Sequence, residues 1–240
     1  MRTPTVVMLY PGHSAEDEYA VLAGSLGDVA LPVLHTWEGP TAHDVEALLE
    51  LGSKDQMVAA AGRARELGPD AVMWACTSGS FVYGPRGVHE QAGWIESAAG
   101  VPASSTSIAF QAAMRHLGLR HPSVAATYPE AVTRHFTGLL AAGGAAVLAV
   151  TSGDVPSGED AGRLDERQVL ELIAGGGHPD EADVVLVPDT ALHTVGLLPR
   201  LEAELGRPVL TANQVTTWFG LRLAGWRGTA EDLGALFAVA

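Results

Sequence analysis

The sequence contains few cysteines and few basic residues, and each shortage limits what the chain can do. Among its 240 residues it has one cysteine, so a disulfide within the chain and a metal cage of several thiolates are excluded. Lysine and arginine together number 14, against 28 acidic residues, which gives a formal net charge of −14. Because nucleic acid binding depends on clustered basic side chains, we expect no nucleic acid partner.

Long apolar runs are also missing. No segment approaches the roughly 18 consecutive apolar residues that a membrane-spanning helix needs, and the N-terminal residues do not resemble a cleaved signal peptide. We therefore expect a cytoplasmic protein with no membrane partner. Hydrophobic residues still make up 47% of the chain, which is enough for the core of one large domain or two small ones.

The histidines give no sign of a metal site. The chain has nine of them, without an HExxH motif and widely spread along the sequence, at His13, His35, His43, His89, His116, His121, His135, His178 and His193. We therefore predict no tight histidine cluster and no bound metal. The glycine pair at 143–144 precedes a predicted strand and the triplet at 175–177 leads to Pro179, so we interpret both as ordinary loops and not as phosphate-binding loops.

Short apolar runs alternate along the chain with helical patterns, which is typical of βαβ units around parallel sheets. The predicted strands cover residues 5–10, 30–35, 71–75, 101–104, 123–127, 145–150, 184–187 and 209–211. The clearest helical patterns cover residues 55–67, 107–117, 129–142, 166–174, 195–205 and 214–223. The sequence thus predicts an α/β fold.

The two halves of the chain share an outline, which indicates duplication. Residues 5–11 resemble 123–129, residues 70–77 resemble 183–190, and residues 100–102 resemble 206–208. We predict two similar, pseudo-symmetric domains, each a parallel sheet flanked by helices: residues 1–116 plus 217–240, and residues 117–216. Because parallel sheets bind ligands at the carboxyl ends of their strands, the active site is expected in the cleft between the domains. Tyr10, Pro11 and Tyr128 would line it.

Cys76 is the first candidate for a chemical role. It follows a predicted strand and opens the segment Cys-Thr-Ser-Gly-Ser, whose small residues offer backbone N–H groups that lower a thiol pKa and bind an oxyanion. Many lone cysteines are inert core residues, but this hydrophilic loop is a poor core sequence. If Cys76 is catalytic, rapid alkylation at neutral pH and protection by a dicarboxylate are expected.

Asp189 is the second candidate, in Val187-Pro-Asp189-Thr-Ala-Leu. An aspartate after a strand is often only a helix cap or part of a turn. The pseudo-symmetry, however, places Asp189 opposite Cys76, so both would face the same cleft.

Two segments carry a resemblance to a known family. ACTSGS at 75–80 and LEAELGRPVLTANQVTTW at 201–218 look like the maleate isomerase and arylmalonate decarboxylase branch of the aspartate/glutamate racemase superfamily. The resemblance implies a two-domain, pseudo-symmetric α/β fold and cofactor-free chemistry next to a carboxylate. It also implies a small carboxylic acid as substrate, and it allows a homo-oligomer.

The resemblance assigns Cys76 but leaves its partner changed. In maleate isomerases two cysteines face each other: one adds to the alkene as a thiolate and the other handles the proton. In arylmalonate decarboxylases only the second is present, and it protonates the enediolate. This chain has the first cysteine, at Cys76, and has Asp189 at the position of the second.

Further site residues carry over by the same resemblance. Ser14 stands where maleate isomerases usually have an asparagine, and Tyr128 matches a carboxylate-binding tyrosine. The remaining positions, where backbone and hydroxyl donors hold substrate carboxylates, are Thr77, Ser78, Thr190 and Ala191.

The aspartate changes the expected chemistry. With an ordinary pKa of about 3.9, against about 8.5 for a thiol, an exposed Asp189 would be an anion at neutral pH and would act as a base. Burial or a nearby substrate carboxylate would be needed to make it an acid.

The leading hypothesis is therefore a cofactor-independent isomerase or racemase of a small carboxylic acid, with Cys76 and Asp189 as opposing acid and base. The first alternative is decarboxylation of a disubstituted malonate. The second is a binding module without chemistry. A hydrolase triad of Ser78, His193 and Asp189 is disfavoured because the chain has no Gly-x-Ser-x-Gly elbow.

Overall fold

The computed structural model describes residues 3–239 and contains two parallel four-stranded sheets. The first sheet has the order β2-β1-β3-β4 and the second the order β6-β5-β7-β8. The strands of the first are β1 (Val6–Pro11), β2 (Val33–Trp37), β3 (Ala71–Trp74) and β4 (Ala103–Ser105). Those of the second are β5 (Pro122–Ala126), β6 (Ala149–Ser152), β7 (Val184–Val187) and β8 (Val209–Thr211). The matching strand orders confirm the predicted pseudo-symmetric α/β fold.

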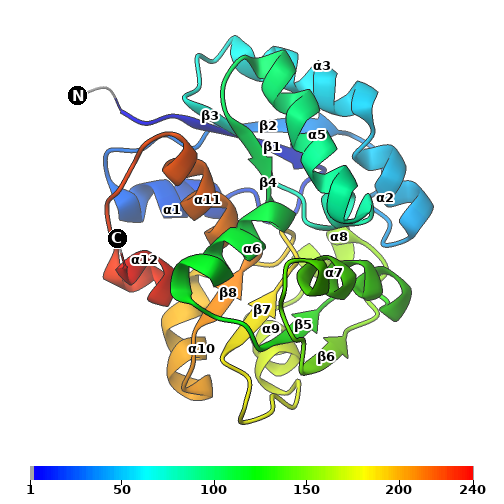
Figure 1. Ribbon diagram of the computed structural model, residues 1–240, viewed down its shortest axis with the longest axis vertical. Coiled ribbons are helices and arrows are strands. Elements are labelled where there is room, and N and C mark those ends of the chain that lie inside the picture. The colour runs from blue at the N-terminus through cyan, green and yellow to red at the C-terminus, as the bar shows by residue number, and fades with distance from the viewer. Residues whose placement is uncertain (1–2, 240) are drawn as a thin grey trace.

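Helices surround both sheets (Figure 1). Those between the start of the chain and β5 are α1 (Glu18–Leu26), α2 (Val45–Leu51), α3 (Lys54–Arg65), α4 (Ser78–Phe81), α5 (Gly84–Ala99) and α6 (Thr106–Leu117). The later ones are α7 (Glu130–Ala142), α8 (Gly158–Gly162), α9 (Glu166–Ala174), η1 (Val195–Leu197), α10 (Leu198–Leu205), α11 (Ala212–Leu223), η2 (Glu231–Leu233) and α12 (Ala235–Ala238).

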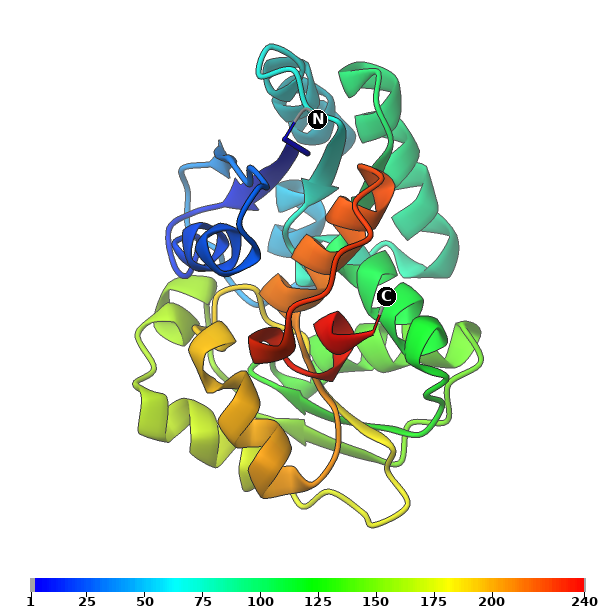
Figure 2. The same cartoon turned by 90° about the vertical axis from the view of Figure 1, so that its left-hand side faces the viewer.

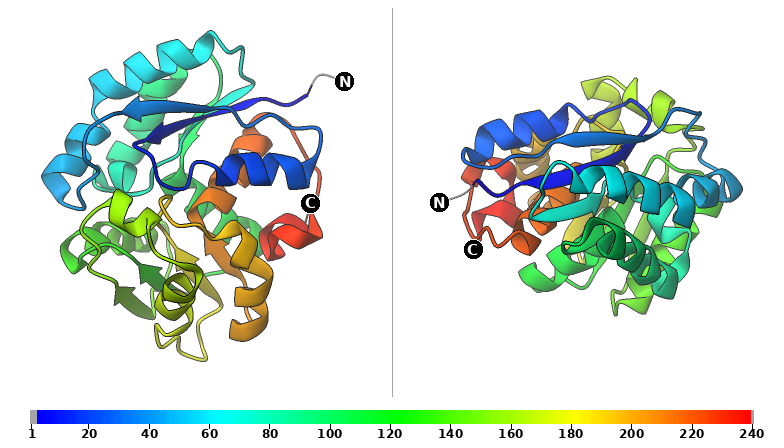
Figure 3. Two further views of the ribbon diagram at one scale, coloured as in Figure 1. Left: turned by 180° about the vertical axis from the view of Figure 1, so that it is seen from behind. Right: turned by 90° about the horizontal axis from the view of Figure 1, so that it is seen from above.

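The first sheet is the middle layer of three. Helices α3 and α5 contact it from one side, and α11 contacts β1, β3 and β4. Helix α11 approaches closely because Gly220 has no side chain; a Cβ there would lie 2.7 Å from Val6 Cγ1. Helices α6 and α11 pack side by side between the two halves (Figure 2). Seen from behind, α1 lies below the first sheet, toward the second half, where it contacts η1 (Figure 3).

Local sequence explains where these two helices begin. The Ser105 side chain accepts a hydrogen bond from the Ile108 N–H and caps α6, which ends at Gly118 in the left-handed conformation. At the equivalent place in the second half, Gln214 Oε1 accepts from the Thr211 N–H at the start of α11. Both strand-to-helix turns follow a last, short strand, so the duplication extends to the caps.

All eight predicted strands are present, but two of these strands and one predicted helix differ from the structure in their limits. The strand expected at 145–150 begins only at Ala149, because the chain first turns through Gly143 and Gly144. The strand expected at 30–35 runs from Val33 to Trp37, and Ala30 forms only an isolated bridge. The helix expected at 195–205 divides into η1 and α10, because Pro199 sits in the first turn of α10.

The predicted domain limits stay a prediction. Position 116 lies in the last turn of α6 and position 217 in the middle of α11, so both limits fall in the pair of helices between the sheets. Within residues 3–239, every helix is too short or too polar to cross a membrane.

Candidate active site

A small cavity of about 20 Å³ lies where the two halves meet. Its wall includes eight residues singled out from the sequence: Tyr10, Pro11, Ser14, Cys76, Ser78, Asp189, Thr190 and Ala191. Cys76 follows β3 and Asp189 follows β7, which are the equivalent central strands of the two sheets. Parallel strands thus bring the thiol and the carboxylate to one cavity from opposite halves.

Cys76 is held in a buried position. Only 4% of the residue is exposed, and its sulfur accepts a hydrogen bond from the Gly79 N–H at 3.3 Å. The Ser78 hydroxyl lies 3.8 Å from the same sulfur. Gly79 is also tightly packed, because a Cβ there would meet the Trp74 ring at 3.1 Å and Cys76 Sγ at 3.2 Å. A larger residue at 79 would displace the thiol.

These surroundings keep the thiol protonated. Burial, and to a smaller extent the negative charge of Asp189, raise the pKa of Cys76 from its ordinary value of 9.0 to about 12. The Gly79 N–H and the Ser78 hydroxyl lower the pKa, as the loop sequence led us to expect, but their effect is smaller than that of burial. Cys76 therefore holds its proton at neutral pH, whereas the sequence alone suggested an activated thiolate.

Asp189 is equally buried, at 4% exposure, and both of its oxygens accept hydrogen bonds. The Thr127 hydroxyl donates a short hydrogen bond to Oδ2, and the Ala191 N–H donates to Oδ1 at 2.9 Å. An ionised carboxylate only accepts hydrogen bonds, so two donors suit that form and fix its orientation. Asp189 therefore has both of the roles expected from the sequence. It stabilises the turn through the Ala191 N–H, and it lies on the cavity wall.

Thr77 and Tyr128 are not among the residues that line the cavity. Thr77 is fully buried and its carbonyl accepts from the Ser107 hydroxyl, while its own hydroxyl has no hydrogen-bond partner within residues 3–239. The Tyr128 hydroxyl donates to the Pro188 carbonyl at 2.6 Å. Burial, and then the negative charge of Asp189, raise the pKa of Tyr128, so this hydroxyl stays a donor. Their contact with substrate stays a prediction.

Sequence reasoning missed one part of the wall. Its residues come from the segment after β2, from α2 and from the start of α8: Thr41, His43, Leu48, Leu51 and Gly158. They do not follow strands, so the rule that located Cys76 and Asp189 could not find them. The folded structure alone shows the constraint on Gly158, where a Cβ would lie 2.6 Å from the Thr41 hydroxyl.

His43 is the titratable residue in this missed part. Its Nδ1 donates to the Val155 carbonyl at 2.8 Å, which leaves Nε2 as the nitrogen able to accept a proton or bind a ligand. The ring packs edge-on against Tyr128, with centroids 4.7 Å apart. Its backbone N–H donates to the Pro156 carbonyl at 2.8 Å, so His43 belongs to a segment of the first half that is hydrogen-bonded to the second.

A buried network joins the halves beside the cavity. The Tyr10 hydroxyl donates to the Thr190 carbonyl at 3.0 Å. Glu18, 4% exposed, accepts from the backbone N–H groups of Thr194 and Val195 and from Asn213 Nδ2. Burial raises the pKa of Glu18, and these hydrogen bonds lower it only partly. Residues 10–18 of the first half are therefore anchored to the second.

Comparison with known proteins identifies the family. The model of the family described as arylmalonate decarboxylase matches residues 51–237. The chain belongs to this family. The resemblance predicted from the sequence is thereby confirmed.

Relatives of the chain in the arylmalonate decarboxylase family and its isomerase branch are enzymes. An arylmalonate decarboxylase of Bordetella bronchiseptica is 28% identical over 146 residues, a match that spans 60% of this chain and 60% of that protein's length. A solved mutant of arylmalonate decarboxylase, in which a glycine is replaced by cysteine and a cysteine by serine, is 25% identical with a TM-score of 0.86. That comparison covers 98% of this chain and 99% of the other.

A maleate cis-trans isomerase also shares the fold. It is a cysteine-to-serine mutant of the Nocardia farcinica enzyme with a covalently bound succinylcysteine intermediate. Its TM-score is 0.89 at 17% identity, over 98% of each chain. At that identity the comparison supports the two-domain architecture.

The hydrolase triad of Ser78, His193 and Asp189 finds no support in the geometry. His193 Nε2 lies 2.9 Å from Asp17 Oδ1, and His193 is not on the wall that carries Ser78 and Asp189.

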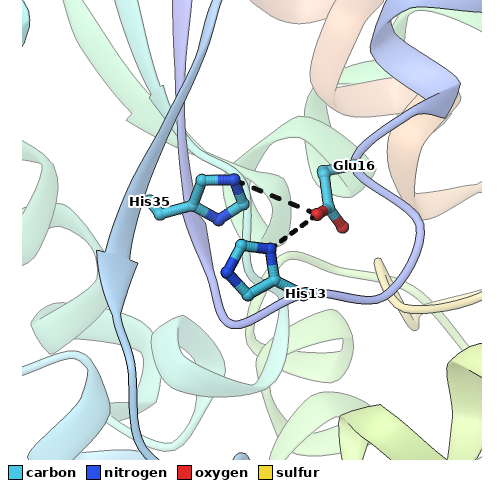
Figure 4. Close-up of side chains that lie close together, drawn as sticks. All are labelled: His13, Glu16 and His35. Atoms are coloured by element: carbon cyan, nitrogen blue, oxygen red, sulfur yellow. Dashed lines mark hydrogen bonds and ion pairs between the residues drawn. The ribbon is translucent and has the colours of Figure 1, made fainter.

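The predicted absence of a histidine cluster is wrong. His13, Glu16 and His35 place one potential ligand atom each within 4.8 Å of the others (Figure 4). His35 is distant in sequence from the other two, and the pairing of β1 with β2 brings it to them.

Proposed function

We propose that this member of the arylmalonate decarboxylase family is a cofactor-independent isomerase or racemase of a small carboxylic acid. It would move a proton at the carbon next to a carboxylate. The single observation that carries this proposal is the pairing of Cys76 and Asp189 on one cavity, with the thiol protonated and the carboxylate arranged as an acceptor. An acid and a base supplied from opposite halves are what proton exchange across a planar intermediate requires.

The proposed reaction proceeds in two proton transfers. Asp189 removes the proton on the carbon next to the carboxylate; that C–H bond breaks and its electron pair forms an enediolate. Cys76 then gives its S–H proton to the opposite face, a new C–H bond forms, and a thiolate remains. Proton transfer from Asp189 to the Cys76 thiolate, directly or through water, restores the starting state. Every proton stays within the pair or returns to it.

Substrate binding would depend on neutral donors. Neither lysine nor arginine is among the residues that line the cavity, whereas Ser78 and Thr190 contribute hydroxyls. The Ser14 hydroxyl also lies on the wall but donates to the Gly158 carbonyl, so it would have to turn from that carbonyl to bind a carboxylate. With a net charge of −14, the chain as a whole repels an anion. We infer that hydroxyls and backbone N–H groups bind the substrate carboxylate, and the small size of the cavity, about 20 Å³, favours a small acid.

Decarboxylation of a malonate is the second candidate, and the family match specifically favours it. In that reaction a C–C bond of the substrate breaks, carbon dioxide leaves, and the electron pair stays as an enediolate. Cys76 then protonates the carbon and regains its proton from water. This route needs one acid and no base, so a single protonated cysteine is sufficient.

Incubation in deuterated water with a panel of maleate, 2-substituted acids and malonates separates the two candidates. Deuterium incorporation without loss of mass supports isomerisation or racemisation, and release of carbon dioxide supports decarboxylation. Cys76→Ser should reduce either activity by about 100-fold or more, because one general acid typically contributes a factor of that size.

Asp189→Asn distinguishes the mechanisms further. It should abolish proton exchange, in which Asp189 is the base, while a decarboxylase would keep most of its activity. Asp180→Asn, which removes an equal charge from an exposed position, is the matched control. Wild-type activity in the Cys76→Ser variant would contradict both proposals.

A further inference from the structure

We propose that His13, Glu16 and His35 form a binding site for a divalent transition metal ion of the Zn²⁺ type. The site is independent of the proposed reaction and lies outside the cavity wall. His13 and Glu16 belong to the loop after β1, and His35 projects from β2 toward them (Figure 4). Two imidazoles and one carboxylate are a ligand set that zinc accepts in proteins.

The distances are close to those of a metal site. Zinc lies about 2.0–2.1 Å from its nitrogen and oxygen ligands, so tetrahedral ligand atoms are separated by about 3.3 Å. His13 Nδ1 is 3.0 Å from Glu16 Oε1, and His35 Nε2 is 3.9 Å from the same oxygen. The two rings are already close, with centroids 4.1 Å apart. To reach about 3.3 Å, Glu16 Oε1 would have to lie about 0.3 Å farther from His13 Nδ1 and about 0.6 Å closer to His35 Nε2.

The hydrogen bonds around the cluster prepare two of the three ligands. His35 Nδ1 lies 2.8 Å from the Gly12 carbonyl, which can only accept, so Nδ1 carries the hydrogen. A neutral His35 therefore presents the lone pair of Nε2 toward Glu16. Glu16 Oε2 accepts from the Ser14 N–H at 2.7 Å, which leaves Oε1 for the metal. Such outer hydrogen bonds orient ligands in metal sites.

The backbone holds the loop in this arrangement. Gly12 has φ +67°, a left-handed conformation that glycine adopts readily, and the chain reverses there so that His13 returns over His35. The Gly12 N–H donates to the Trp37 carbonyl at 3.1 Å, which ties the turn to the end of β2. The side chains of His13, Glu16 and His35 are 64%, 23% and 30% exposed, so water can fill the other coordination positions.

The location gives the ion a structural role. The same loop carries Ser14, whose hydroxyl donates to the Gly158 carbonyl of the second half at 3.1 Å, and Ala15, whose N–H donates to the Tyr10 hydroxyl. A metal bound to His13 and Glu16 would fix this loop against β2. It would thereby stabilise one wall of the cavity without contacting a substrate.

The test is zinc binding to the full chain without a polyhistidine tag, after treatment with a chelator. Competition with a chromogenic zinc indicator should give one equivalent bound. Glu16→Gln and His35→Gln should each weaken binding roughly tenfold or more, since each removes one of three ligands. His121→Gln is the matched control, because His121 also pairs with a carboxylate, Asp183, but without a third ligand. It should bind zinc as the wild type does.

Two further measurements keep the proposal refutable. Cys76→Ser must retain the bound equivalent, because loss of zinc there would place the ion at the thiol instead. Zinc should raise the melting temperature of the wild type and of Cys76→Ser but not of folded Glu16→Gln. If the wild type binds less than one equivalent, or if the Glu16 and His35 variants bind as tightly as the wild type, the proposed site does not exist.

Discussion

The protonated state of Cys76 makes a quantitative prediction about its reactivity. Alkylation by iodoacetamide requires the thiolate. A pKa of about 12 in place of 9.0 leaves about one thousandth as much thiolate near neutral pH, because each pH unit changes the ratio tenfold. The folded chain should therefore react about a thousand times more slowly than an ordinary thiol, and the rapid alkylation suggested by the loop sequence is no longer expected.

The pH dependence separates protonation from simple inaccessibility. A buried but ordinary thiol reacts slowly at every pH, and its rate levels off near pH 9. A thiol whose pKa is raised to about 12 reacts tenfold faster for each pH unit up to at least pH 10. Because Cys76 is the single cysteine of the chain, the mass of the intact protein reports this reaction directly, and the chain unfolded in urea provides the reference rate.

One variant tests the cause. Asp189→Asn removes the negative charge that raises the pKa of Cys76, so the folded variant should alkylate faster than the wild type at pH 8. Asp180→Asn, an exposed site, should leave the rate unchanged. A rate that levels off at or below pH 9 in the wild type, or equal rates in wild type and Asp189→Asn, would refute the reasoning.

Two other predictions concern stability. Glu18→Ala leaves the Thr194 N–H and two other buried donors without an acceptor and should cost about 3–5 kcal/mol, measured from urea unfolding; a loss below 1 kcal/mol would contradict the role of this network. Gly52→Ala would place a Cβ 2.1 Å from the Gly79 carbonyl, so it should cost about 2 kcal/mol or more. Gly62→Ala, an open helical position, should instead gain up to about 1 kcal/mol, and equal effects of the two substitutions would exclude a steric cause.

Much of the fold followed from the sequence because its signals are local. The buried run Val184–Val187 is found with the predicted limits, and the helix expected at 107–117 ends at Leu117, as predicted. Strand ends are local signals too. The rule that ligands bind beyond the carboxyl ends of parallel strands therefore located Cys76 and Asp189 without knowledge of any distance.

The rest of the site depends on contacts between distant segments. His43 reaches the cavity through hydrogen bonds to residues 155 and 156, more than a hundred positions away, and no local pattern encodes them. The protonation of Cys76 is likewise set by burial and by a charge from the other half. The cluster of His13 with His35 requires the register of β1 against β2. Each of these properties arises only when the chain has folded.

The hydrogen bonds between residues 41–43 and residues 155–159 affect how ligands enter and leave the cavity. Thr41 accepts from the Gly158 N–H through its carbonyl, and its hydroxyl donates to Glu159, while Ala42 bridges to Ser157. Together with the buried network at Glu18, these bonds oppose a hinge motion that would separate the halves as rigid bodies. We expect exchange of ligands to be limited instead by local release of the segment at 41–43, so its amide hydrogens should exchange with solvent faster than those of the two sheets.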